Sequence, residues 1–332
     1  MFPGEAAALA AASPVFTDER IMKRFIRYFL KWTALFLLGS VLAFLLVRMM
    51  PVSPVEQALT RDRLPQTAEN IAYMEHRMGL DQPLPSQYIS WLLRFVSGNW
   101  GESLVSGADI KAQFIRKMPY SFSIGILGLL LASVAAFGIG YRAAVRGQGF
   151  CDRASAALAV FSQSVPSFIT AVVLIYFLGV RFHLVRFFTG TPLASVLTAI
   201  LLSALYLVGN LSRVVRKAFL EEKEASYVRF SVARGFAPEY VLLHHASRPV
   251  LCRLLSVLMA NFAWVFGGST VLEFAFGIPG ISFFLVESMK ARDYSVLQTY
   301  IMMIMLWMFA VHLVMEGLLL LLDIRNRGED YS

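Results

Sequence analysis

Few side chains in this sequence have the types and spacings that enzymes use for catalysis. The sequence contains neither an HExxH motif nor a GxxxxGK[ST] phosphate-binding loop, and no catalytic constellation falls within its apolar stretches. The two cysteines, Cys151 and Cys252, belong to no CxxC or Cys/His pattern, which argues against a disulfide framework and a structural zinc site. We therefore expect no catalytic residue and no metal site.

One ionisable pair could still carry chemistry. His312 and Glu316 are four residues apart in an apolar stretch, so they share one face of a helix, and several methionines lie nearby. A soft-metal pathway is one interpretation, because imidazole and thioether groups bind such metals. A packing and hydrogen-bonding pair is the other, since methionine is a common filler of helix interfaces. We favour the second interpretation and keep the first as a functional hypothesis.

The composition indicates a membrane protein. The chain has 332 residues, of which 57% are hydrophobic and 16% charged, and its mean hydropathy of +0.62 exceeds what a soluble domain can bury. Stretches without Asp, Glu, Lys or Arg occupy residues 32–47, 119–141, 154–180, 187–212, 254–272 and 294–315. Each is close to the 17 to 25 residues, roughly, that a spanning helix needs. We expect an all-α polytopic membrane protein with six transmembrane helices.

The basic residues indicate the orientation. The net charge is +8, and Lys and Arg crowd residues 20–31, 142–153 and 213–253, which marks these regions as cytoplasmic. The charge thus reports topology, and we expect membrane lipid, not nucleic acid, around the chain. The start of the chain lacks a charged region ahead of its short apolar run, so we expect the first span to be retained as the insertion signal.

These patterns divide the chain into five parts. The division is a cytoplasmic N-terminus (1–24), a first transmembrane helix (25–49), an extracytoplasmic segment (50–118), a transmembrane domain (119–323) containing a long cytoplasmic loop (213–253), and a cytoplasmic C-terminus (324–332). The extracytoplasmic segment has apolar residues at helical spacing, which predicts two short amphipathic helices. A solvated cap and a docking surface for a partner are both open interpretations of that segment.

Polar residues interrupt two of the expected spans. Gln163, Ser164 and Pro166 lie in the third span, where the proline predicts a kink. Asn261 and the small residues 267–270 lie in the fifth span and would let another helix approach closely. Helix packing and the lining of a pathway both remain possible functions for these positions.

The loop at 213–253 is far longer than a turn between antiparallel spans requires. Its pattern predicts an amphipathic helix over 217–234, a stop at Gly235, a new start at Pro238, and a second helix over 239–247. Taken alone, such a basic hairpin could lie on anionic lipid.

Residues 224–235 (EASYVRFSVARG) and 245–248 (HASR) resemble the cytoplasmic coupling loop of binding-protein-dependent ABC importer permeases, in the dipeptide, oligopeptide and nickel branch. Further segments are similar to that branch in the same order along the chain, and together they cover most of residues 24–325. These segments are MGLD at 78–81 with Pro83 and residues 87–88, SVPSF at 164–168, EFAFGIPG at 273–280, RDY at 292–294 and LDIR at 322–325.

The resemblance implies the type I importer permease fold and a set of partners. These would be a second homologous permease, two ATP-binding subunits that carry the ATP and Mg²⁺, and an extracytoplasmic solute-binding protein, in a bacterial cytoplasmic (inner) membrane. The chain itself would bind no cofactor and be no enzyme. The resemblance assigns ATPase coupling to Glu224, Tyr227, Val228, Arg229, Ala233, Arg234, Gly235 and His245, and the translocation path to Gln163, Ser164, Pro166, Asn261 and Glu273.

Two departures from the family pattern matter. The connection at 183–192 is shorter than usual, and His312 and Glu316 stand where the family tends to have asparagine and aspartate. The second departure makes a polar pair a family feature and weakens the metal hypothesis. The expected substrate is a short peptide, with nickel or a metal chelate second. An ion-gradient-driven secondary transporter is the alternative function, although the sequence has no convincing internal repeat.

Overall fold

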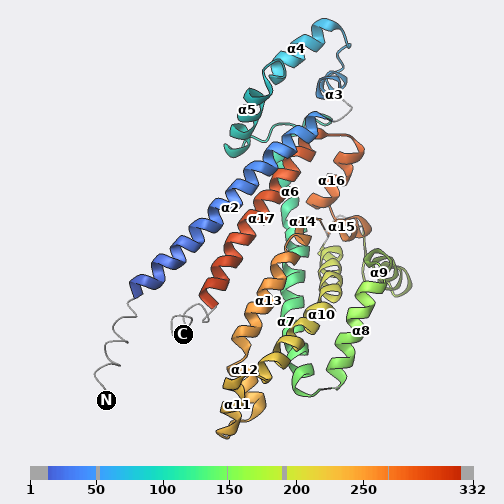
Figure 1. Cartoon of the computed structure of the whole chain (residues 1–332). Coiled ribbons are helices and arrows are strands. Elements are labelled where there is room, and N and C mark those ends of the chain that lie inside the picture. The colour runs from blue at the N-terminus through green and yellow to red at the C-terminus, as the bar shows by residue number, and fades with distance from the viewer. Residues whose placement is uncertain (1–13, 50–52, 148, 189–192, 268, 323–332) are drawn as a thin grey trace.

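The computed structural model describes residues 14–49, 53–147, 149–188, 193–267 and 269–322, and its regular structure is helical (Figure 1). Within these residues the only strand-like pairing outside the helices is a single bridge between Glu102 and Asp109. The predicted all-α class is therefore confirmed. The predictions for residues 1–13 and 324–332 lie outside the described residues, as does part of the 183–192 connection.

The described residues contain four helices long and apolar enough to cross a membrane, and two bent pairs that raise the number to six if each pair is one span. The four are α2 (Pro14–Arg48), α6 with η1 and α7 (Ile110–Phe122, Ser123–Leu127, Gly128–Val145), α10 (Leu193–Lys223) and α17 (Tyr294–Leu322). The bent pairs are α8 (Phe150–Ser164) with α9 (Ser167–Leu174) and η2 (Ile175–Arg181), and α13 (Ser247–Asn261) with α14 (Trp264–Gly267) and α15 (Thr270–Phe276).

Several helices extend past the boundaries predicted from the sequence. The first begins at Pro14, not at residue 25, and the second begins at Ile110, not at 119. The fourth continues to Lys223, eleven residues beyond the charge-free stretch that ends at 212. Absence of charge marks only the part of a helix that lies in hydrocarbon, and a helix can continue into water because its backbone hydrogen bonds are internal.

Small residues let the central helices approach closely. A Cβ placed on Gly209 of α10 would lie 2.4 Å from the backbone nitrogen of Ala159 in α8, and one on Gly140 of α7 would lie 2.7 Å from the carbonyl oxygen of Ser212. Larger residues would force the backbones apart at both contacts. Helices α7, α8 and α10 therefore form a tight unit, and the largest apolar cluster of the molecule continues from it into α13 and α17.

The segment between the first two spans forms three helices, one more than predicted: α3 (Pro54–Arg61), α4 (Ala68–Met78) and α5 (Leu84–Val96). The unpredicted α3 is only eight residues long, too short for a clear periodic pattern. It forms because Ser53 caps its N-terminus and because Leu59 packs against Met74 of α4 in a separate apolar cluster.

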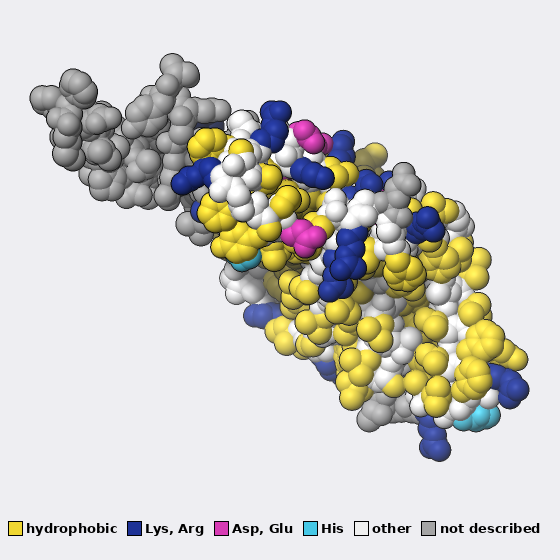
Figure 2. Space-filling model, turned by 90° about the horizontal axis from the view of Figure 1, so that it is seen from below, with side chains coloured by type: hydrophobic (Ala, Val, Ile, Leu, Met, Phe, Trp, Pro, Cys, Tyr) yellow, Lys and Arg dark blue, Asp and Glu magenta, His cyan; other side chains and the backbone are white. Residues whose placement is uncertain are grey.

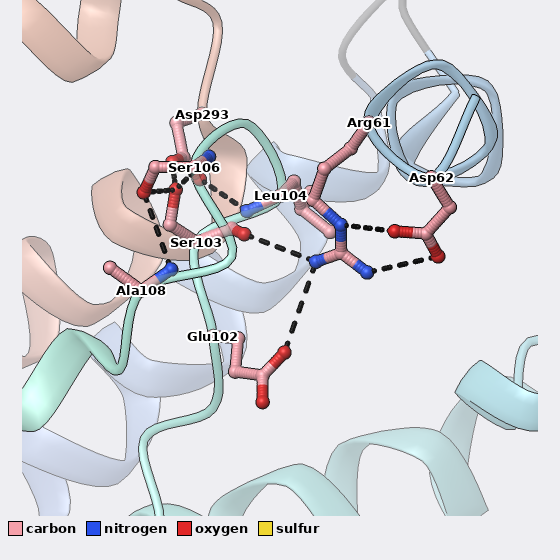
Figure 3. Close-up of polar contacts among 8 residues, drawn as sticks. All are labelled: Arg61, Asp62, Glu102, Ser103, Leu104, Ser106, Ala108 and Asp293. Carbon is pink, nitrogen blue, oxygen red and sulfur yellow. Dashed lines mark hydrogen bonds and ion pairs between the residues drawn. The ribbon is translucent and has the colours of Figure 1, made fainter.

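Hydrogen bonds attach this segment to the start of α17 (Figure 3). The buried carboxylate of Asp293 accepts hydrogen bonds from the Ser103 hydroxyl and, at 3.2 Å, from the Leu104 backbone nitrogen. Arg61 of α3 donates to the Ser103 carbonyl oxygen at 3.3 Å and also pairs with Asp62. The α3–α5 segment is thus held to the bundle by polar contacts and is not a free loop.

Candidate functional site

The end of the bundle opposite α3–α5 is a helical hairpin of α11 (Ser226–Ala233) and α12 (Pro238–His244), which connects α10 to α13 (Figure 1). Its inward side chains belong to the same apolar cluster as α10, and Val228, Val241 and Leu242 are all 3% exposed or less. Burial of this kind fixes the hairpin on the fourth and fifth spans. The hairpin can therefore transmit a displacement to both spans.

Polar contacts reinforce this attachment. The Tyr227 hydroxyl of α11 donates to Glu222 Oε2 of α10 at 2.6 Å, and Arg253 of α13 lies 3.6 Å from the other oxygen of the same carboxylate. The Tyr141 hydroxyl of α7 donates to the Glu239 carbonyl oxygen of α12 at 3.1 Å. Burial, followed by the hydrogen bond to Glu222, raises the pKa of Tyr227, so the phenol remains a donor at neutral pH.

Gly235 ends α11 with a backbone conformation that favours glycine. Its φ is 95°, in the region that side chains with a Cβ rarely adopt. The Phe236 backbone nitrogen donates to the Ser231 carbonyl oxygen at 3.3 Å, and the Gly235 nitrogen donates to the Val232 carbonyl oxygen at 2.9 Å. These two hydrogen bonds form a Schellman motif, which reverses the chain toward α12. The predicted stop at Gly235 is confirmed.

The outward surface of the hairpin is aromatic and basic. Phe230 is 64% exposed, and Phe236 and Tyr240 are each 49% exposed. The Arg234 guanidinium lies 5.7 Å from the centre of the Phe230 ring. Figure 2, which looks onto this end of the molecule, shows Lys and Arg side chains among hydrophobic ones. Exposed aromatic rings beside arginine are typical of surfaces that bind another protein.

Most of the residues that sequence similarity assigned to coupling are exposed on or beside the hairpin. They are Glu224, Tyr227, Arg229, Ala233, Arg234, Gly235 and His245. Val228 differs, because it is buried against the core and positions α11 instead of facing a partner. The prediction of one continuous helix over 217–234 is wrong: α10 ends at Lys223 and α11 starts at Ser226. The break at the extended Ala225 redirects the chain, so that Val228 faces the core.

The predicted kink in the third span is confirmed and is much sharper than a packing kink, since α8 and the α9–η2 helix meet at 101°. Ser164 and Pro166 lie at the bend and are exposed. The carbonyl oxygen of Val165, which a straight helix would have paired, accepts a hydrogen bond at 2.9 Å from the Tyr206 hydroxyl of α10. A neighbouring helix thus satisfies the group that the bend frees, as a membrane interior requires.

The polar residues proposed to line a path have different surroundings. The exposed Gln163 donates from Nε2 to Asn210 Oδ1 of α10 at 3.1 Å. Asn261 is half-buried and donates from Nδ2 to the Val257 carbonyl oxygen of its own helix at 2.9 Å. Gln163, Ser164 and Pro166 therefore remain available to a path shared with a second chain, and their function there stays a prediction, as does that of Asn261.

Glu273 does not line an open path in this structure, contrary to the expectation from the sequence. Its side chain is 0% exposed. Oε1 accepts hydrogen bonds from the hydroxyls of Ser121 at 2.7 Å and Ser269 at 2.8 Å, and Oε2 accepts one from the Phe283 backbone nitrogen at 2.8 Å. The carboxyl group therefore joins the second span, the fifth span and α16 (Ile281–Lys290).

His312 makes the local contacts expected of a packing residue. Its Nδ1 donates to the Met308 carbonyl oxygen at 2.8 Å, and its ring centre lies 3.9 Å from that of Trp32 in the first span. Glu316, which lies on the same helix, is buried. In the part of the chain that the structure describes, no group of three or more His, Cys, Asp or Glu side chains could hold a metal ion. The geometry favours a structural function for the pair.

Sequence reasoning missed the residues that complete these contacts. Asn210, Tyr206 and Ser121 each supply a hydrogen bond at a bend or a buried carboxyl group. The available signal was a polar side chain within an apolar stretch, since such a group in hydrocarbon needs a partner.

Membrane-length helices that carry a firmly packed, exposed hairpin at one end define a multi-pass membrane protein. Comparison with known proteins identifies the family of membrane protein. The chain belongs to the family described as binding-protein-dependent transport system inner membrane component, which it matches over residues 114–328, and residues 21–123 match that family's N-terminal region. It is thus an importer permease of the ABC type, and the secondary-transporter alternative is not supported.

Three relatives represent the similarity. A probable peptide ABC transporter permease, y4tP of Sinorhizobium fredii, is 29% identical over 297 residues, covering 87% of this chain and 94% of the relative. The dipeptide transport system permease DppB of Bacillus subtilis is 31% identical over 276 residues, covering 82% and 87%. The nickel import system permease NikB of Staphylococcus aureus is 26% identical over 288 residues, covering 87% of both chains.

Proposed function

We propose that this chain and a second, homologous permease together form the translocation path of an importer with two ATP-binding subunits and a solute-binding protein. The observation that carries the proposal is the α11–α12 hairpin, whose aromatic and basic surface is exposed while its inner side is fixed to α10 and α13. In this mechanism the hairpin sits in a groove of an ATP-binding subunit. ATP binding and hydrolysis on the partners would move it and shift the spans between two openings.

The proposed assignment leaves ATP and Mg²⁺ on the partner subunits, so this chain has no enzymatic activity of its own. The hairpin end would be cytoplasmic in a bacterial inner membrane, with both chain termini on that side. Two features support this orientation. Basic residues are concentrated at 213–253, and the first described turns of α2 and the last of α17 lie on the side away from α3–α5 (Figure 1).

Short peptides are the proposed substrate class, with nickel or a metal chelate second. The support is the printed function of the relatives, two of which are permeases for peptides and one for nickel. A solute-binding protein would supply most of the selectivity, so the path needs only to be wide and weakly selective. Uptake of a labelled dipeptide and of nickel by cells that carry the whole transporter would decide between the two classes.

Crosslinking tests the coupling assignment. In a background with Cys151 and Cys252 replaced by serine, cysteines at Tyr227 and Arg234 should crosslink to the ATP-binding subunit, with a yield that changes when nucleotide is added. A cysteine at Glu69, exposed in α4 at the opposite end, is the matched control and should give no adduct. Labelling of 227 and 234 by a lipid-phase reagent, without an ATPase adduct, would instead show that the hairpin lies on the membrane.

A further inference from the structure

A basic cavity of about 350 Å³ lies at the α3–α5 end of the bundle, between α2, α4, α5 and α17. Three arginines line it, Arg48 from the end of α2, Arg77 from α4 and Arg94 from α5, together with Trp91 and Gln87. No carboxylate belongs to the described residues that line it. The lining therefore suits an anion.

The three arginines, Arg48, Arg77 and Arg94, have no carboxylate partner among the residues that the structure describes. Asp62, whose pKa is lowered chiefly by its hydrogen bond to Arg61 and to a lesser degree by Arg77, is already held by Arg61. Three positive charges around one cavity repel one another, which an external anion would relieve.

The contacts of α5 place the cavity at the depth of lipid headgroups. The Tyr88 hydroxyl lies 2.8 Å from the Ser40 hydroxyl, and the Trp91 ring centre lies 5.8 Å from that of Phe44. Ser40 precedes Arg48 by eight residues, about 12 Å along the helix. The middle of α5 therefore packs on the last turns of the first span, and the cavity that holds Arg48 lies where that span leaves the hydrocarbon.

Apolar surface continues from the cavity toward the membrane interior. Leu45 and Val41 precede Arg48 by three and seven residues, on the same side of α2, and both are exposed. On α5, Leu93 is 65% exposed, and Ile89, one turn before it, is also exposed. Side chains of this kind at this depth are suited to contact with acyl chains. The face of α2 on the membrane side of Arg48 is thus suited to contact with acyl chains.

We propose that this cavity binds the headgroup of an anionic phospholipid, with the phosphate accepted by Arg48, Arg77 and Arg94 and the acyl chains lying along Leu45 and Val41 of α2. Guanidinium groups bind phosphate oxygens with well-defined geometry. The buried Gln87 completes the site: its Oε1 has no hydrogen-bond partner among the described residues, so it can accept a hydrogen bond from a headgroup hydroxyl such as that of phosphatidylglycerol.

The test measures lipid binding to the purified full-length chain by native mass spectrometry, with phosphatidylglycerol and phosphatidylcholine offered in equal amounts. The wild type should retain phosphatidylglycerol preferentially. The Arg48→Gln/Arg94→Gln variant should lose affinity by about fivefold for each arginine removed. Arg48→Lys/Arg94→Lys, which keeps the charge, should retain most of the preference. The matched control is Arg63→Gln/Arg116→Gln, two exposed arginines outside the cavity, one just after α3 and one in α6, which should bind as the wild type does.

Several outcomes would overturn the proposal. Equal retention of the two lipids would remove the anionic preference, and competition by millimolar glycerol 3-phosphate as effective as that by the lipid would indicate a soluble anion. Unchanged binding in the Arg48→Gln/Arg94→Gln variant would place the lipid elsewhere. If that double variant fails to fold, Arg77→Gln, at an exposed position on α4, is measured in its place, with about a fivefold loss expected. Crosslinks from the cavity to a partner subunit, with lipid excluded, would show that acidic protein residues occupy it instead.

Discussion

A single buried carboxyl group, that of Glu273, joins three helices of the bundle, because each of its oxygens accepts hydrogen bonds from a different element. Burial makes such a group a strict requirement, since donors left unpaired in a low-dielectric interior cost far more than donors at the surface. At the other end of the molecule, Gly235 has an equally strict requirement that arises from the backbone. Its open surroundings leave space for a side chain, but its φ of 95° does not favour one.

Replacement of Glu273 should destabilise the bundle in a graded way. Glu273→Gln keeps one acceptor oxygen but turns the other into a donor, which leaves one of three donors unpaired at a cost of about 1–3 kcal/mol. Glu273→Ala leaves all three unpaired and adds a cavity, so its loss should be larger. Thermal unfolding in detergent measures both. Equal stability of Glu273→Ala and wild type would contradict the structural function assigned here.

Substitution of Gly235 should impair coupling without removing the protein from the membrane. Gly235→Val forces a β-branched residue into a positive φ at a cost of about 2 kcal/mol, or a roughly thirtyfold smaller population of the intact turn. Gly235→Asn should cost less, because asparagine tolerates such φ values better. The measurement is substrate uptake and ATPase stimulation in the reconstituted transporter. A Gly235→Val complex that transports at the wild-type rate would rule out the proposed function of this turn.

At the scale of elements, the sequence predicted the helical class, the bend at Pro166 and the stop at Gly235, because each depends on local signals. It did not predict where helices end when their ends lie outside the hydrocarbon, as at Ile110 and Lys223. It also could not predict that Val228 faces inward or that Glu273 is enclosed. Both facts depend on how one helix is rotated against its neighbours. For Val228, the amphipathic pattern around 217–234 is too interrupted to define that rotation.

The bend between α8 and α9 should depend on Tyr206 as well as on the proline. The hydroxyl of Tyr206 donates to the Val165 carbonyl oxygen and lies 2.7 Å from the Thr170 hydroxyl. Tyr206→Phe leaves that carbonyl group unpaired within the membrane, so we expect a loss of about 1–3 kcal/mol in thermal unfolding and faster hydrogen exchange over residues 167–174. Tyr176→Phe, at an exposed ring of η2, is the control and should change neither quantity. Unchanged exchange in Tyr206→Phe would assign the bend to the proline alone.

At the scale of the whole molecule, the α11–α12 hairpin and the α3–α5 segment are each attached firmly to the spans, at opposite ends of the bundle. The hairpin is fixed to α10 and α13 by apolar burial. At the other end, hydrogen bonds around Asp293 connect α3, through the loop at 103–104, to the start of α17 (Figure 3), whereas α5 packs by apolar contacts, with Phe95 in the same buried cluster as Tyr300 of α17. A displacement imposed on the hairpin can therefore reach the far end only through the spans. Helix α3 will follow α17 as long as the contacts of Asp293 remain, and α5 will follow it through the apolar cluster around Phe95.

Removal of the Asp293 carboxylate should loosen α3, and with it α4, which packs against α3. Asp293→Ala leaves the Ser103 hydroxyl and the Leu104 nitrogen without their acceptor, and it removes the side chain that also accepts from the Val296 nitrogen in the first turn of α17, at 3.4 Å. We expect a local loss of about 2 kcal/mol, and therefore roughly thirtyfold faster hydrogen exchange across α3 and α4. Amides of α10 and the hairpin should be unaffected, because the apolar cluster that holds them does not include these residues.

Glu102→Ala is the matched control for this prediction, since Glu102 also belongs to the polar contacts of Figure 3. Its carboxylate lies 3.9 Å from Arg61, and its side chain is 66% exposed, a geometry in which an ion pair contributes at most about 1 kcal/mol. Exchange in α3 and α4 should therefore change little in this variant. If Glu102→Ala accelerates exchange as much as Asp293→Ala does, the surface charges hold the segment and the buried carboxylate does not. Acceleration across the whole molecule in Asp293→Ala would mean that the segment and the bundle unfold as one unit.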